Sequence, residues 1–350
     1  FGSSLLAPCS TLHVLWQLLP CQLMFSRWLK VLAAVWIVSN SVQGTRASDP
    51  PRPFSELKIG VPELHGKDAA TLSVGDIEVY VQKVADRPKV FKISGLVSEE
   101  EGQQMIEQAM QEDRFGSITN TGRRNDWRQS TQCWLRKDGE ASPAIASVAQ
   151  RVSRLLSVPL EAVQAGHPMQ VLEYSRGGKY LPHFDSRFIE KLLEYPDTPS
   201  DYKKYKVYGG FPRAARATTL FCSLKQAKAG GNTTFPLALS DGHGRPYPTQ
   251  EKLDSLASKN PAALETWMAT LPGYCSGNAT DGGAHVELQR GDCVLFYNHL
   301  LSKDGKVAEL DKRSYHAGCE VLKGKKWGIN WWLEVSPPFA QRHAGRKAEL

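Results

Sequence analysis

The chain has 350 residues, of which 41% are hydrophobic and 23% are charged, and its formal net charge is +7. This composition argues against disorder or a coiled coil and predicts a globular protein of one large or two modest domains. The basic residues are scattered along the sequence, with one short run at 323–326, which argues against nucleic acid as a partner.

Both ends of the chain indicate the secretory pathway. The first methionine is Met24, so residues 1–23 are interpreted as untranslated or additional N-terminal sequence. Residues 24–44 combine a charged start, a short apolar run and small residues, as a signal peptide does, with an uncleaved signal anchor as the alternative. The tail at 338–350 ends in Lys-Ala-Glu-Leu, close to the tetrapeptide that retains proteins in the endoplasmic reticulum lumen.

The region that follows the signal is predicted to be mostly linker. Residues 45–88 are rich in Pro and polar residues and contain one expected strand at 77–81. Two helices come next. The first follows Ser98, which forms a capping-box pattern with Glu101, and the second begins at Ser142-Pro143.

From about Met169 the pattern changes to short apolar runs separated by Gly and Pro. Strands are predicted at 218–224, 292–297, 314–321 and 327–335. Helices followed by many short strands favour an α+β domain built on a β-sandwich or open barrel. Two stretches, near 187–210 and 238–285, are interpreted as insertions in the domain.

A histidine and a carboxylate two residues apart provide the first candidate site. In an extended segment the side chains of His183 and Asp185 point to the same side. Two imidazoles and one carboxylate hold Fe(II) on one face of an octahedron and leave positions open for substrate and O2. His316 is the candidate third ligand because a lysine follows it at ten residues. His285 and His299 are alternatives that lack such a basic residue on a neighbouring strand.

Several motifs occur in one order and with a consistent spacing. They are Gln170–Tyr174, Gly177–Tyr180, Pro182–Asp185, Arg216–Leu220, Ala229–Pro236, Gly291–Tyr297, His316–Cys319 and Gly324–Trp327. With them, residues 89–337 resemble the peptidyl-prolyl 4-hydroxylases of the α-subunit-like, plant and algal type, a branch of the Fe(II)/2-oxoglutarate-dependent dioxygenases. The resemblance implies a double-stranded β-helix (jelly roll) core with supporting N-terminal helices, and His183, Asp185 and His316 as the metal ligands.

The resemblance also implies the small molecules that the site takes: Fe(II), 2-oxoglutarate, O2 and ascorbate. The far carboxylate of 2-oxoglutarate is buried in such sites and needs a cation, because an unpaired buried charge is costly. Lys326 fits this role, since a turn at 323–324 would return its strand beside the strand of His316 and alternation turns Lys325 away. In related proteins the hydroxyls that match Tyr174 and Thr219 bind the same co-substrate.

The implied activity is that of an oxidoreductase, the hydroxylation of peptidyl proline to 4-hydroxyproline in secretory-pathway proteins. A proline-rich peptide or protein is therefore the expected partner. The resemblance places Arg128 and Ser130 near its groove. Further residues expected to line the groove are Trp134, Arg176 and Trp331, because aromatic faces suit polyproline helices, although sheet packing would also explain them.

Two other activities stay open on the sequence. The chain could be a 2-oxoglutarate dioxygenase acting on another side chain or a small molecule, or a catalytically silent homologue that binds proline-rich peptides. No tandem helical repeats precede the domain, so we expect a monomer that needs no disulfide-isomerase subunit. No stable membrane span is expected unless the signal stays uncleaved.

Five cysteines follow the expected signal, and an odd number in an oxidising compartment implies a free thiol or an intermolecular bridge. Cys222 and Cys293 lie in strand-like runs, where buried thiols are expected. Cys275 is expected to pair with Cys319.

Overall fold

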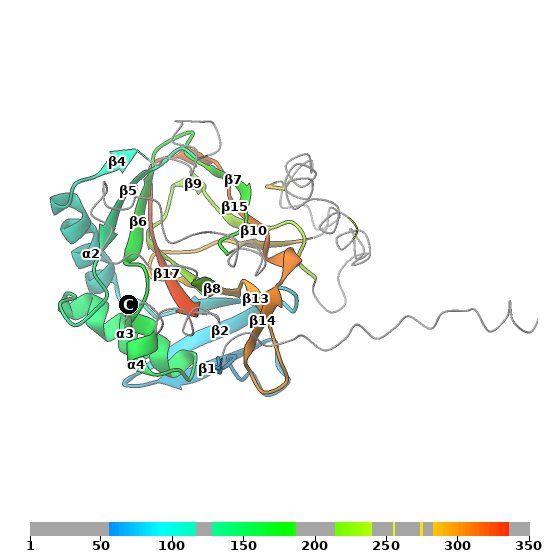
Figure 1. Cartoon of the computed structure of the whole chain (residues 1–350). Helices are drawn as coiled ribbons and strands as arrows, with labels where there is room; N and C mark the ends of the chain where they lie inside the picture. Colours follow the sequence, from blue (N-terminus) through cyan, green and yellow to red (C-terminus); the bar gives the residue numbers. More distant parts are fainter. Residues whose placement is uncertain are drawn as a thin grey trace, which may run out of the picture. The chain divides into compact units, whose positions relative to one another are not determined.

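Antiparallel strands provide the framework of the protein (Figure 1). The computed structural model describes residues 56–116, 128–186, 214–239, 255, 274–275 and 283–335, all within the second of two units, 51–350. The expected signal, the C-terminal tail and most of both expected insertions lie outside the described residues.

The larger sheet has nine strands. In spatial order they are β1 (Ala69–Val74), β2 (Ile77–Ala85), β3 (Val90–Ser94), β12 (Cys293–Tyr297), β8 (Ala215–Lys225), β17 (Lys326–Val335), β6 (Met169–Tyr174), β5 (Thr131–Leu135) and β4 (Phe115–Gly116). Strands far apart in the sequence are neighbours here, since β12 pairs with β3 and β8, and β17 pairs with β8 and β6.

The smaller sheet has four strands, in the order β11 (Ala284–Val286), β10 (Thr233–Phe235), β15 (His316–Gly318) and β7 (Tyr180–His183). Two short ladders complete the strand pairing: β13 (His299–Leu301) with β14 (Val307–Leu310), and β16 (Val321–Lys323) with β9 (Ala229–Gly230). A short 3-10 helix, Lys312–Ser314, precedes β15.

Apolar side chains fill the space between the two sheets. This inner core contains residues of both sheets, among them Leu172, Tyr174, Phe221, Phe235, Val286, Val294 and Phe296. Phe235 of the smaller sheet meets Phe296 of the larger sheet edge to face, with ring centroids 5.0 Å apart. Two antiparallel sheets packed in this way form the expected jelly-roll architecture.

The other face of the nine-stranded sheet carries the helices α2 (Glu99–Gln111), α3 (Pro143–Leu155) and α4 (Leu160–Gln164), which lie together on one side of it (Figure 1). Their apolar residues and those of the strands beneath form the outer core, which includes Met105, Ile145, Val148, Ile329 and Trp331. The two expected helices are therefore confirmed as supports of the sheet.

The helix starts follow the sequence signals. Ser98 and Glu101 form the capping box at α2, with the Ser98 hydroxyl accepting from the Glu101 amide and the Glu101 carboxylate accepting from the Ser98 amide. Pro143 lies at the first position of α3, but the Ser142 side chain makes no capping hydrogen bond.

The domain begins earlier in the sequence than the predicted boundary at residue 89. The expected strand at 77–81 is β2, and it pairs with both β1 and β3 within the large sheet. The described part of 45–88 therefore belongs to the domain instead of forming a linker. The alternation of Val79 and Val81, both fully buried, provides the outer-core contacts that hold β2 in place.

The cysteine predictions are half right. The expected pair Cys275–Cys319 forms a disulfide, and Cys133 is a buried free thiol. Cys222 and Cys293 are not free thiols but a second disulfide, because β8 and β12 place them directly opposite each other. Within the described residues, no helix is long and apolar enough to cross a membrane.

Candidate metal centre

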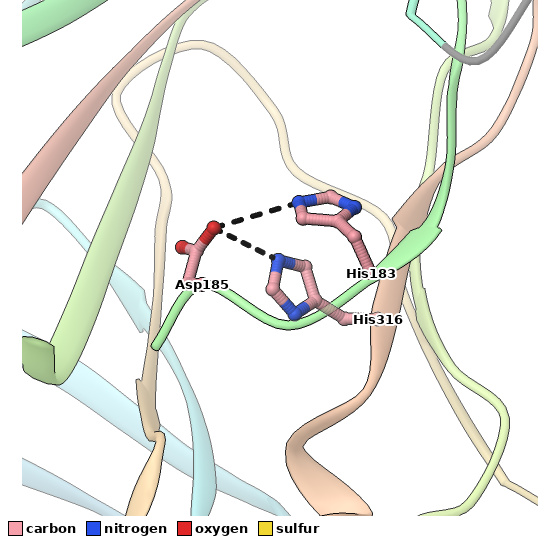
Figure 2. A group of neighbouring side chains, drawn as sticks. All are labelled: His183, Asp185 and His316. Atoms are coloured by element: carbon pink, nitrogen blue, oxygen red, sulfur yellow. Dashed lines mark ion pairs between the residues drawn. The ribbon is translucent and has the colours of Figure 1, made fainter. Parts of the chain in front are cut away.

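The three expected ligands converge inside the jelly roll (Figure 2). His183 ends β7 and His316 begins β15, and these residues are paired across the two antiparallel strands. Asp185 lies just after β7, where the chain leaves the sheet and turns its carboxylate toward both rings.

The donor atoms lie close enough for one ion to contact all three. Asp185 Oδ1 is 3.5 Å from His183 Nε2 and 3.7 Å from His316 Nε2. The ligand atoms all lie within 4.8 Å of one another. His316 is 6% exposed, so the site is shielded from bulk water.

Backbone carbonyls orient both imidazole rings. His183 Nδ1 lies 2.8 Å from the carbonyl oxygen of Leu181, and His316 Nδ1 lies 2.9 Å from that of Ser314. A carbonyl can only accept, so each Nδ1 carries the proton and each Nε2 keeps its lone pair for a metal. Burial, helped by the neighbouring His183, lowers the pKa of His316 to about 4, so this ring is neutral at physiological pH.

The carboxylate of Asp185 is held by its other oxygen. Oδ2 accepts hydrogen bonds from Thr219 Oγ1 at 2.8 Å and from Trp332 Nε1 at 3.1 Å, which leaves Oδ1 directed at the histidines. Burial alone would raise the pKa of Asp185, but His316, His183 and the Arg216 guanidinium together hold it well below its usual range. The carboxylate is therefore ionised, as a metal ligand requires.

Arg216 and Trp332 were not predicted from the sequence. The guanidinium of Arg216 lies over the Trp332 ring at 3.6 Å and donates to the backbone carbonyl of Asp185 at 3.3 Å. Alternation along β17 could have revealed Trp332, because residues 326, 328, 330 and 332 share one face of the strand.

Two histidine nitrogens and an ionised carboxylate oxygen, facing one another in a largely buried position, fit an Fe(II) ion. The other nitrogen of each ring and the second oxygen of Asp185 are hydrogen-bonded, as the ligands of a metal ion usually are. His299, an alternative ligand on the sequence, instead accepts from or donates to Ser186 Oγ at 2.8 Å and lies 2.8 Å from the Ala308 carbonyl through its other nitrogen. It is not part of the three-residue cluster.

Lys326 also faces the inner core. Its ammonium donates to the Gly231 carbonyl at 2.5 Å and lies 4.7 Å from the Phe221 ring centroid. Burial lowers the pKa of Lys326 to about 8, and no carboxylate of the described residues forms an ion pair with it. Lys325 points the opposite way and pairs with Glu173 at 2.6 Å, as alternation predicts.

The route by which Lys326 reaches the site differs from the expectation. Its strand β17 does not lie beside the strand of His316, because β17 belongs to the nine-stranded sheet and β15 to the four-stranded one. Gly324, at φ +85°, still allows the turn between β16 and β17. Lys326 therefore enters the space between the sheets from the nine-stranded sheet, where its ammonium lies beside Phe221 and Gly231.

The two expected hydroxyls occupy different positions. Tyr174 pairs with Lys326 across β6 and β17, and its ring lies 5.9 Å from the lysine ammonium. Burial raises the pKa of Tyr174, with Arg128 and Ser130 opposing the shift. Thr219 instead donates to Asp185, so in this structure it holds a metal ligand.

Only some of the residues expected to line the peptide groove lie near the metal site. Arg128 lies 4.6 Å over the ring of Tyr180, which stacks on His183 at 3.5 Å, and Ser130 lies near the Tyr174 hydroxyl. The Trp134 ring lies 6.0 Å from that of Trp332. Arg176 is exposed in the turn after β6.

The prediction that Trp331 lines the peptide groove is wrong. It lies in the outer core, 4% exposed, and its indole donates to the Val163 carbonyl of α4 at 3.3 Å. A one-residue difference reverses the face of a strand, so Trp332 and not Trp331 faces the metal site.

The comparisons agree with this geometry. Residues 169–334 match the family model described as the 2OG-Fe(II) oxygenase superfamily. A transmembrane prolyl 4-hydroxylase of Mus musculus is 30% identical over 217 residues, which are 61% of this chain and 39% of the relative. Prolyl 4-hydroxylase 1 of Arabidopsis thaliana is 27% identical over 271 residues, which are 76% of this chain and 75% of that protein. The chain thus spans well under half the length of the first relative.

Among solved structures, a viral collagen prolyl hydroxylase from Paramecium Bursaria Chlorella virus-1 is 18% identical. The match covers 70% of this chain and 96% of that chain, with a TM-score of 0.40.

Proposed function

We propose that the protein hydroxylates peptidyl proline at carbon 4, because residues 169–334 match the family model of the 2OG-Fe(II) oxygenase superfamily. The reaction takes Fe(II), 2-oxoglutarate and O2. The relatives named as prolyl 4-hydroxylases support the substrate class. The observation that carries the proposal is the presence of the ligand triad opposite a buried lysine of the other sheet, which has no carboxylate partner among the described residues.

His183, Asp185 and His316 would hold the iron, with both rings fixed by backbone carbonyls and the carboxylate fixed by Thr219 and Trp332. When bound, iron supplies the redox chemistry that couples the decarboxylation of 2-oxoglutarate, to succinate and CO2, to insertion of oxygen into the substrate.

Lys326 would neutralise the far carboxylate of 2-oxoglutarate. Burial removes most of the water around its ammonium, so an arriving carboxylate would provide the charge partner that is absent among the described residues. Tyr174, next to Lys326 across the strand pair, would donate its hydroxyl to the same co-substrate. The neighbouring walls of the inner core exclude water from the reacting atoms.

The peptide would approach from the side of the ligands on which Tyr180 lies. The Arg128, Tyr180 and His183 stack joins a cation, a phenol and a ligand ring in one column beside the metal site. Trp134, whose ring lies 6.0 Å from that of Trp332, is the partly exposed aromatic residue near the same ligands. Such faces suit a polyproline helix.

We place the reaction in the secretory pathway, with ascorbate as the reductant that restores iron after uncoupled turnover. Two disulfides support an oxidising compartment. Retention in the endoplasmic reticulum lumen, a monomeric state and independence from a disulfide-isomerase subunit belong to the same proposal.

The test is the transfer of one oxygen atom to poly-L-proline, followed by amino-acid analysis for 4-hydroxyproline. The protein with Fe(II), ascorbate and 2-oxoglutarate should form it, and His183→Ala should not. Wild-type turnover of 2-oxoglutarate without any hydroxyproline would keep the dioxygenase and reject the prolyl substrate. Peptide binding without any turnover would instead support a silent homologue.

A further inference from the structure

Two adjacent polar residues, Asn298 and His299, lie at the corner where β12 ends and β13 begins. Asn298 is 0% exposed and His299 is 1% exposed. The backbone fixes the corner, because the Asn298 amide donates to the Ala217 carbonyl of β8 and the Asn298 carbonyl accepts from the Asp311 amide, both at 2.9 Å. The side chains of both residues make hydrogen bonds to neighbours of the metal ligand Asp185.

Asn298 reaches Asp185 through one intervening hydroxyl. Its Nδ2 donates to Thr219 Oγ1 at 2.9 Å, and Thr219 Oγ1 donates to Asp185 Oδ2 at 2.8 Å. A hydroxyl has a single proton, so an acceptor in place of the amide nitrogen would compete with the carboxylate for it. The Asn298 amide therefore sets the direction of the hydrogen bond that holds the ligand.

This orientation of the amide leaves a buried oxygen unsatisfied. Asn298 Oδ1 has no hydrogen-bond partner among the described residues. A buried acceptor without a partner is costly, and the opposite orientation of the amide would place Oδ1 against the Thr219 hydroxyl. Asp185 is ionised and can only accept, so that orientation would leave two acceptors with one proton. The unsatisfied oxygen thus indicates that the donor is kept at Thr219 for the sake of the metal ligand.

His299 holds the residue that follows the ligand. Its Nδ1 lies 2.8 Å from the Ala308 carbonyl of β14, which can only accept, so Nε2 accepts from Ser186 Oγ at 2.8 Å. Burial lowers the pKa of His299 to about 4, so the ring is neutral and keeps this direction at physiological pH. Ser186 is 7% exposed, so its hydroxyl is closed to a substrate and the pair anchors the chain instead of acting as nucleophile and base.

The same corner is connected to a second metal ligand. The Asp311 amide donates to the Asn298 carbonyl, and the Ser314 amide donates to the Asp311 carbonyl, each at 2.9 Å. The Ser314 carbonyl in turn orients His316 Nδ1 at 2.9 Å. One buried corner is thus linked to two ligands that are far apart in the sequence.

We propose that Asn298 and His299 are positioning residues for the metal. Asn298 orients the Asp185 carboxylate through Thr219, and His299 anchors the Asp185 backbone through Ser186. The inference rests on the proposed function, because it concerns the metal site of that reaction. Neither residue belongs to the ligand triad, so each acts only through the hydroxyl that it contacts.

The test measures Co(II) binding by the full chain, so that it does not depend on turnover. Co(II) follows Fe(II) in the affinity series of divalent metals, and competition with a chelator gives its dissociation constant. Ser186→Ala and Asn298→Leu should each weaken Co(II) binding by about tenfold, the lower end of the effect of losing an outer partner of a metal ligand.

Ser153→Ala is the matched control for a lost hydroxyl. Ser153 lies on α3, where its hydroxyl donates to the Val158 carbonyl at 2.6 Å. Its loss should leave the Co(II) affinity within about twofold of wild type, because α3 packs on the other face of the large sheet.

Two double-mutant cycles separate positioning from a general loss of structure. Asn298→Leu should weaken Co(II) binding by about tenfold in wild type but by less than about twofold in Thr219→Val, where the intervening hydroxyl is absent. His299→Leu should show the same dependence on the Ser186 hydroxyl. His299→Gln, whose side-chain oxygen can still accept from Ser186, should keep the affinity within about threefold of wild type.

The outcomes that would overturn the inference are distinct. An unchanged Co(II) affinity in Asn298→Leu would overturn the role of Asn298. An unchanged affinity in Ser186→Ala, which removes one oxygen atom and covers the case of a larger variant that does not fold, would overturn the role of His299. Equal losses with and without the hydroxyls would overturn both roles, because the corner would then act on stability alone.

The wild-type protein distinguishes this inference from the proposed function. If wild type binds Co(II) and the variants bind it equally well, the positioning roles fail and the metal site stands. If wild type binds no Co(II), the proposed function fails as well.

Discussion

The two faces of the nine-stranded sheet have different chemistry although they share the same strands. On β17, Trp327, Ile329 and Trp331 enter the outer core beneath the helices, whereas Lys326 and Trp332 face the space between the sheets. The outer face consists of apolar contacts that stabilise the fold. The inner face keeps a charged amine and an ionised carboxylate out of water. Strand alternation thus separates stability from binding within a single element.

The largest expected effect is on the inner face, at the metal site. Asp185→Asn removes the ligand charge but keeps the shape of the side chain, so the three-donor site loses iron. Because metal catalysis contributes several kcal/mol, turnover should fall by at least about three orders of magnitude. Glu173→Gln is the matched control, since this carboxylate of β6 pairs with Lys325 and Arg114 on the opposite face. Iron content by metal analysis and succinate release would show whether only Asp185→Asn is affected.

A substitution in the outer core should lower the stability of the protein and leave its turnover and KM almost unchanged. Ile145 of α3 is fully buried, so Ile145→Ala should lower the free energy of unfolding by about 2–5 kcal/mol, through lost burial and the cavity left behind. The KM for 2-oxoglutarate should stay within about twofold, because the residue lies beyond the sheet from the site. Denaturant unfolding and steady-state kinetics measure the two quantities. A large change in KM together with normal stability would show that the outer face also contributes to binding.

Lys326→Met should change both co-substrate affinity and stability, weakening the first and raising the second. Losing the cation should weaken 2-oxoglutarate binding by about 100-fold, as for other truncated buried charge pairs. The free energy of unfolding should rise by roughly 1–3 kcal/mol, because the lowered pKa of Lys326 reflects an unfavourable buried charge. Lys137 is the control: it is also buried with a pKa of about 8, but it donates to the Trp332 carbonyl. Lys137→Met should leave the affinity within a few-fold, and equal losses of affinity in both variants would remove the special role of Lys326.

The pH dependence gives a smaller and more specific effect. The pKa of Lys326 is about 8 in the folded protein and 10.5 ordinarily, so between these values the unfolded chain binds more protons. The stability cost of Lys326 is therefore fully present below about pH 8 and is relieved as the pH rises toward 10.5. Affinity for 2-oxoglutarate should change in the other direction and fall about tenfold per unit above pH 8, as the ammonium is lost. Calorimetric titrations from pH 7 to 9.5 measure this, and Lys326→Arg, which stays charged, should show no such decline.

Spacing along the chain was sufficient to predict the parts of the site that lie on single strands. The opposite orientations of Lys325 and Lys326 follow from period-two alternation. Asp185 was predicted from its spacing to His183, but it lies beyond β7, where the chain has left the sheet. The capping box at Ser98 predicted the start of α2 because the cap is local. In each case the residues that interact are close in sequence.

Long-range pairing could not be predicted in the same way. The disulfide between Cys222 and Cys293, which are 71 residues apart in the sequence, depends on the register of β8 against β12. Trp331 was expected to line the peptide groove because of its aromatic ring, and the register of β17, which places it in the outer core, was not available from the sequence. The contribution of β1 and β2 to the large sheet also depends on pairing that continues into β3 and β12.

The ligand triad at the smaller sheet and Lys326 of the larger sheet form one site. The most direct measurement is peptide-dependent succinate release from 2-oxoglutarate by wild type, Asp185→Asn and Lys326→Met in parallel, with iron content determined for each protein. We predict that Asp185→Asn loses both iron and turnover, whereas Lys326→Met keeps its iron and recovers part of its turnover at high 2-oxoglutarate. Normal turnover in either variant at low 2-oxoglutarate would contradict the account.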